Sequence, residues 1–168
     1  MPVVRTVTSL ALAAGLALAL KVAALEVGQA APPLTLPDAA GAPQDLAALQ
    51  GKVVYVDFWA SWCGPCRHSF PWMNAMQEKY GPQGLAILGI NLDEEPADAA
   101  GFLAKMPAKF QVLYDRSGAT PTAYGVKGMP TSVLIGRDGT VLFQHIGFTK
   151  EGSAGLEDAI ATAVGATP

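Results

Sequence analysis

Cys63 and Cys66 are the only two thiols of the 168-residue chain, and they stand three positions apart with Gly64 and Pro65 between them. Such a pair can form a structural disulfide, contribute to a metal site or carry out thiol–disulfide exchange. A loop of four residues gives a disulfide little entropic stabilisation. A closed zinc site would need both cysteines and both histidines of the chain. Redox chemistry is therefore the interpretation that the pattern favours.

The segments on either side of the cysteines predict a strand followed by a helix. Residues 52–59 are rich in β-branched and aromatic side chains, which is typical of a buried strand. A helical pattern covers residues 65–80 and stops at Gly81 and Pro82, and residues 85–92 form a second apolar run. Strand, helix and strand in this order predict a right-handed βαβ unit. The cysteines therefore lie at the carboxyl end of a strand, where open α/β sheets place their chemistry.

This position predicts different roles for the two thiols. Unpaired N–H groups and the helix dipole favour a thiolate at the start of a helix, and Cys63, the outer residue, gains most. Cys66 lies one turn further in, close enough to attack the sulfur of Cys63 and too buried to meet a substrate first. Gly64 allows close approach of a partner chain, and Pro65 suits the first helical position. We expect Cys63 to attack and Cys66 to resolve.

The amino-terminal segment predicts export. One positive charge in residues 1–5, an apolar run over residues 7–20 and small residues at 22–24 have the order of a signal peptide. The run stops at Lys21 and is shorter than the roughly 20 residues that span a membrane, so we expect cleavage near Ala24. The alternative is an uncleaved anchor over residues 7–25, with Lys21 reaching the interface. In either case the folded domain comprises residues 25–168.

Charge and compartment limit the possible partners. The formal charge is −3, and it becomes −5 when Arg5 and Lys21 are removed with the leader. Without a basic patch the domain has no electrostatic footprint for nucleic acid. Export implies an oxidising compartment. We expect a monomer.

Residues 57–67, DFWASWCGPCR, resemble the active-site segment of thioredoxins. Pro71 resembles the proline that bends the active-site helix in that family. Residues 126–131, VKGMPT, resemble the loop with the family's cis-proline, and a hairpin (132–146) and a closing helix (150–164) follow. The resemblance implies an α/β thioredoxin fold, with a central mixed β-sheet flanked by helices.

Three further segments resemble exported thiol:disulfide oxidoreductases of the TlpA, ResA and DsbE kind. They are residues 27–32, 51–54 and 93–113, which imply an N-terminal extension and an inserted helix–strand element. This resemblance implies a periplasmic enzyme that reduces disulfides in exported protein substrates. Its electrons would come from a membrane thiol-transfer protein of the DsbD or CcdA kind. Beyond the redox-active Cys63–Cys66 disulfide it would need no cofactor.

Some positions depart from the pattern of these relatives. Ser69 stands where many members of the subgroup have a glutamate. Thr131 stands where members acting in cytochrome c maturation often have one, which argues against a haem apoprotein as substrate. Asp57 matches the buried acid of thioredoxins, and Gly89 replaces the lysine that accompanies this acid.

Asp57 is a candidate proton acceptor. A carboxyl group buried on a strand without a cation has an increased proton affinity. Our hypothesis is that Asp57, through water, takes the proton of Cys66 while Cys66 attacks the mixed disulfide. The alternative is a solvated aspartate at the end of the strand.

The remaining candidates concern substrate binding. A cis peptide bond at Pro130 would present the backbone of Met129 to an incoming peptide, whereas an ordinary trans proline would open an edge strand. Trp62 is expected to flank the reactive sulfur as an exposed apolar contact, and Trp59 and Trp72 to serve packing. His68 is expected on a solvated helical face, with electrostatic tuning of Cys66 as the alternative. Residues 93–95 are expected to cap a helix over 96–105.

Two alternative functions stay open. A thiol peroxidase would normally carry a threonine three residues before its reactive cysteine, where this chain has Ala60. A dithiol can also hold copper or prepare copper sites for an oxidase.

Overall fold

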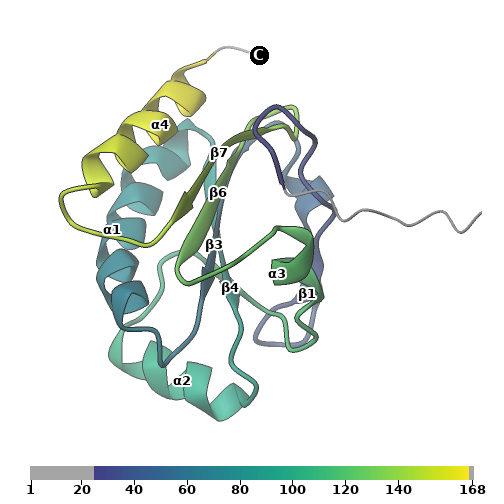
Figure 1. Cartoon of the computed structure of the whole chain (residues 1–168), viewed down its shortest axis with the longest axis vertical. Coiled ribbons are helices and arrows are strands. Elements are labelled where there is room, and N and C mark those ends of the chain that lie inside the picture. Colours follow the sequence, from purple (N-terminus) through teal and green to yellow (C-terminus); the bar gives the residue numbers. More distant parts are fainter. Residues whose placement is uncertain (1–24, 167–168) are drawn as a thin grey trace, which may run out of the picture.

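The computed structural model describes residues 25–166, in a five-stranded mixed sheet with helices on both faces (Figure 1). The predicted signal peptide or anchor over residues 1–24 lies outside the described residues. Among the described residues, no helix combines the length and the apolar character needed to cross a membrane. The strands, in their order across the sheet, are β5 (Gln111–Tyr114), β4 (Leu85–Asn91), β3 (Val53–Trp59), β6 (Thr131–Ile135) and β7 (Val141–Ile146).

The predicted βαβ unit forms the centre of the molecule. All seven residues of β3 are buried, because the strand is covered on both faces, and β3 pairs in parallel with β4. Helix α1 (Gly64–Tyr80) connects the two strands, contains Pro71 and is followed by a short 3-10 helix (Gly81–Gln83). Strand β6 joins β3 from the other side in antiparallel orientation and pairs with β7. The mixed sheet agrees with the fold predicted from the sequence.

Two additions complete the domain. The inserted element consists of α2 (Pro96–Lys105) and β5, which adds a parallel strand at the edge of the sheet. The N-terminal extension forms a small antiparallel ribbon, β1 (Thr35–Pro37) and β2 (Pro43–Asp45), followed by a 3-10 turn (Leu46–Leu49). The ribbon and the short helix α3 (Ala119–Ala123) were not predicted from the sequence.

The sheet separates two hydrophobic cores. Helix α1 and helix α4 (Ser153–Gly165) lie on one face, and α3 and the β1–β2 ribbon lie on the other (Figure 1). On the α1 face, the ring of Phe70 lies 4.8 Å from Trp59, 4.8 Å from Phe102 and 5.2 Å from Phe110, measured between centroids. This aromatic cluster packs the inserted element against α1 and β3, next to the two cysteines.

Candidate active site

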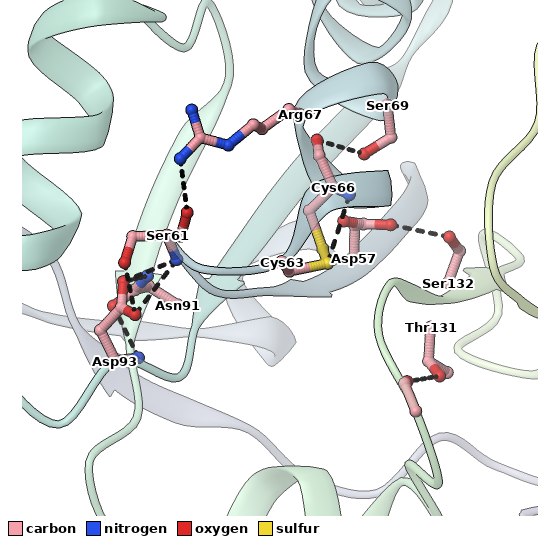
Figure 2. The surroundings of a disulfide bond; sticks show 11 residues. Asp57, Ser61, Cys63, Cys66, Arg67, Ser69, Asn91, Asp93, Thr131 and Ser132 are labelled. Carbon is pink, nitrogen blue, oxygen red and sulfur yellow. Dashed lines mark hydrogen bonds between the residues drawn. A yellow bond between two sulfur atoms is a disulfide. The ribbon is translucent and has the colours of Figure 1, made fainter.

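The two cysteines form a disulfide at the first turn of α1 (Figure 2). Cys63 is the N-cap residue of the helix, and its Sγ accepts a hydrogen bond of 3.2 Å from the backbone N–H of Cys66. Cys63 keeps 5% of its surface exposed, whereas Cys66 has 0%. After reduction, the same N–H group and the start of the helix would favour a thiolate on Cys63.

A groove of about 570 Å³ opens beside the disulfide. Trp62 forms one wall and is 71% exposed, so its ring is available to a partner. The predicted substrate contacts Gly64, Pro65 and Met129 also line the groove. The complete lining is Trp62, Cys63, Gly64, Pro65, Leu92, Pro121, Val126, Lys127, Gly128 and Met129.

The Met129–Pro130 peptide bond is cis, as the resemblance implied, so the alternative of an ordinary trans proline is wrong. Two hydrogen bonds hold this loop. The hydroxyl of Thr131 donates to the carbonyl of Gly128 at 2.6 Å, and the N–H of Gly147 donates to the carbonyl of Pro130 at 2.7 Å. Pro130 itself is buried and does not line the groove, whereas Met129 is partly exposed and does.

Asp57 belongs to the surroundings of the disulfide and is directed towards Ser132 (Figure 2). It is 1% exposed, so the alternative of a solvated aspartate is wrong. One carboxylate oxygen accepts a hydrogen bond of 2.8 Å from the Ser132 hydroxyl, and the other has no partner among the described residues. Burial raises the pKa of Asp57 to about 7, although the bond from Ser132 opposes the rise.

Gly89 lies directly opposite Asp57 on β4, as expected from the sequence. A Cβ atom at this position would lie 2.8 Å from the ring of Phe110 and 3.2 Å from Nε1 of Trp59. The space that a larger side chain would need beside Asp57 is therefore filled by the inserted element and by the core. This packing explains why no cation accompanies the carboxyl group from β4.

Comparison with known proteins assigns the chain to a family. Residues 26–161 match the Redoxin family. The chain belongs to the Redoxin family. The thiol-disulfide oxidoreductase ResA of Bacillus anthracis is 36% identical over 123 residues, which cover 73% of this chain and 71% of ResA. ResA of Bacillus subtilis strain 168 is 33% identical over 115 residues, 68% of this chain and 64% of that protein.

Solved structures agree with the sequence relatives. A Chlorobium tepidum protein assigned as the thiol:disulfide interchange protein DsbE has a TM-score of 0.82 and 52% identity, and the match covers 84% of this chain and all of the other. This Redoxin-family chain is thus a TlpA/ResA/DsbE-like member of the thioredoxin superfamily. It is a thiol–disulfide oxidoreductase, and such enzymes act on proteins.

Two polar residues of the Redoxin domain differ from what was predicted. Asp93 has another role than expected, and Ser132 was not predicted. Asp93 was expected to cap α2, but that helix begins after Glu95, and Asp93 is 3% exposed and bonded to Ser61. Ser132 was not singled out at all. For Asp93 a signal existed, since it closely follows the carboxyl end of a parallel strand, where functional side chains gather.

The remaining polar candidates are Ser69, His68 and His145. The Ser69 hydroxyl is buried and donates to the carbonyl of Cys66 at 3.0 Å, so it carries no acid function. His68 is exposed on α1, as expected. His145 is half-buried on β7, where its ring stacks on Phe143. Within residues 25–166, no cluster of three or more His, Cys, Asp and Glu side chains could hold a metal ion.

Gly89→Ala is expected to lower the free energy of unfolding by about 1–3 kcal/mol, because the new methyl group must displace the Phe110 ring. Urea denaturation measures this change. The control is Gly155→Ala in α4, where a Cβ meets open space and the helix gains propensity. Equal losses in both variants would contradict the packing explanation.

Ser132→Ala is expected to raise the pKa of Asp57 above about 7, by roughly one further pH unit, because the carboxylate loses the hydroxyl that stabilises its charge. The pH titration of the Asp57 carboxyl carbon by NMR measures the change. Thr131→Val removes a neighbouring hydroxyl that bonds Gly128 instead, so it should leave this titration in place. An unchanged titration in Ser132→Ala would refute the assignment.

Proposed function

We propose that this protein reduces disulfide bonds in exported proteins. The Cys63 thiolate attacks one sulfur of the substrate, forms a mixed disulfide and releases the other sulfur as a thiolate. Cys66, deprotonated, then attacks Cys63 and releases the second substrate thiolate. Two electrons have passed to the substrate, and the Cys63–Cys66 disulfide remains. The supporting observation is that the Cys63 sulfur caps α1, accepts from the Cys66 N–H and lies in a groove.

Asp57 accepts the proton of Cys66 in the second step. Cys66 has 0% exposure, so bulk water has no direct access to it. Burial raises the pKa of Asp57 to about 7, which suits a group that must take and release a proton near neutral pH. Its free carboxylate oxygen can accept a water molecule that bridges to the thiol.

The substrate is an extended segment that lies in the groove between Trp62 and the cis-proline loop. The backbone of Met129 pairs with it, while the flexible Met129 side chain and the Trp62 ring adapt to different sequences. Gly64 and Pro65 form the floor next to the sulfur and leave room for the substrate backbone. No cofactor beyond the dithiol enters this reaction.

Reduction in an oxidising compartment requires an electron supply. The donor is a membrane thiol-transfer protein of the DsbD or CcdA kind, and the site of action is the periplasm. The signal-like segment supports export, and residues 7–25 would tether the domain if they are not cleaved. A secreted disulfide oxidoreductase of Mycobacterium tuberculosis is 25% identical with a TM-score of 0.67, over 77% of this chain and 95% of the other, and it supports export.

Insulin reduction tests this function. With dithiothreitol as the electron source, the purified domain should accelerate the precipitation of the reduced B chain. Titration of the reduced protein with Cu(I) tests the copper alternative, and peroxide consumption tests the peroxidase alternative. Absence of insulin reduction together with stoichiometric copper binding or rapid peroxide turnover would overturn the proposal.

A further inference from the structure

Ser61, two residues before Cys63, is bound through both its backbone and its side chain. Its N–H group donates to the two carboxylate oxygens of Asp93 at 3.1 and 3.0 Å, and its hydroxyl donates to the same carboxylate at 3.0 Å. Figure 2 shows Ser61 between Asp93 on one side and Arg67 on the other. The loop that leads to the disulfide is therefore anchored at one residue.

The anchor is rigid because Asp93 is itself fixed. It is 3% exposed, and its carboxylate accepts a further bond of 2.8 Å from the side-chain amide of Asn91. The backbone N–H of Asp93 donates to the amide oxygen of Asn91 at 3.2 Å. Asn91 is the last residue of β4 and is paired with Trp59 of β3, so the carboxylate is held by the end of the sheet.

Arg67 holds Ser61 from the opposite side. Its guanidinium donates to the carbonyl of Ser61 at 3.1 Å and lies over the ring of Phe102, 5.4 Å from the centroid. Asp93 begins the inserted segment, and Arg67 belongs to the first turn of α1. Ser61 is thus held between the inserted segment and the active-site helix, directly before Trp62 and Cys63.

We propose that Asp93 is a positioning residue for thiol exchange. By holding Ser61, it keeps the Cys63 sulfur at the start of α1, opposite the N–H of Cys66. The inference rests on the proposed role of Cys63 as nucleophile. The inserted segment then contributes to the reaction, because it supplies the Asp93 carboxylate that holds the loop before Cys63.

When Asp93 is replaced, the loss of its charge and the loss of its positioning contacts predict opposite changes in the reactivity of Cys63. A negative charge near Cys63 disfavours its thiolate, so removal of the charge alone would make Cys63 more reactive. Loss of positioning would move the sulfur away from the Cys66 N–H and make it less reactive. The other charged or titratable groups around the loop and its grooves are Asp57 on β3, Arg67 on α1, Glu94, Glu95, Asp98 and Lys105 of the inserted segment, and Lys127 beside the groove. The Asp93 and Ser61 variants below leave all of them unchanged, and the control variant replaces Glu94 alone.

The test is the rate at which iodoacetamide alkylates Cys63 in the reduced full-length protein at pH 6, with the modified residue identified by mass spectrometry. In Asp93→Asn, the new amide group faces N–H donors, so a bond to Ser61 or Asn91 is lost. We expect alkylation to slow by about tenfold, the effect of one charge-assisted hydrogen bond. Glu94→Gln, an exposed neighbour, removes the same charge without this contact and should react as fast as the wild type or faster.

If Asp93→Asn does not fold, two variants of Ser61 test the positioning role. Ser61→Ala removes one hydroxyl and should slow alkylation by about threefold, whereas Ser61→Thr keeps the hydroxyl and should restore the rate. An Asp93→Asn rate at or above that of the wild type, or Ser61→Ala without effect, would overturn the positioning role. If Cys63 of the wild-type protein reacts no faster than Cys66, the proposed function itself fails.

Discussion

Replacing Cys66 with serine should stop the reaction at the mixed disulfide. Cys63 can still attack, but no thiol remains to displace the substrate from it. We expect insulin reduction to fall by at least about 10³-fold, the scale on which loss of a member of a catalytic unit acts. Non-reducing electrophoresis and mass spectrometry should show a covalent adduct through Cys63, which dithiothreitol releases.

The matched variant is Cys63→Ser, which should lose the same activity without trapping a substrate. The difference arises because Cys66 is fully buried, whereas Cys63 lies in the groove. Adducts of similar yield from both variants would mean that either thiol can meet the substrate first. The order of attack proposed above would then be wrong.

Asp57→Asn should make the protein more stable at alkaline pH and less active. The ordinary pKa of an unfolded aspartate is near 3.9, and burial raises the pKa of Asp57 to about 7. Well below pH 4 the group is protonated in both states. As the pH rises from 4 to 7, the unfolded state loses the proton first, so the free energy of unfolding falls. Above pH 7 the loss is complete and on the order of 4 kcal/mol.

Urea denaturation of the oxidised protein at pH 4 and pH 8.5 measures this effect. Asp57→Asn should unfold with nearly the wild-type free energy at pH 4 and with a higher one at pH 8.5, and Asp98→Asn, at an exposed site, should show no such difference. The second exchange step should slow by at least about a hundredfold, because the proton acceptor is gone. If Asp57→Asn has the wild-type free energy of unfolding at pH 8.5, ionisation of the buried carboxyl group does not destabilise the folded protein.

Much of this arrangement could be predicted from the sequence because local signals and tertiary packing agree. The β-branched run before Cys63 predicted β3 to within one residue, and Pro65 and Gly81 marked the ends of α1. The loop around Pro130 and the helix at residues 96–105 followed from resemblance to known families, and the structure has both.

The features that could not be predicted depend on pairing between distant segments. Ser132 contacts Asp57 across 75 positions of sequence, and only the register of β6 on β3 brings them together. Asp93 is 32 positions from Ser61, and in the sequence it looked like one of three acids before a helix. The strands β1 and β2 have three residues each, too few for a periodic pattern to be recognised.

The proposed reaction depends on Cys63 being the reactive thiol at the junction of β3 and α1. The most direct measurement is the rate of iodoacetamide alkylation of each cysteine in the reduced protein from pH 5 to pH 9. Cys63 should be modified first and should reach half of its maximal rate at a clearly lower pH than a thiol in a free peptide. Two cysteines that both react like free-peptide thiols, or Cys66 reacting first, would contradict it.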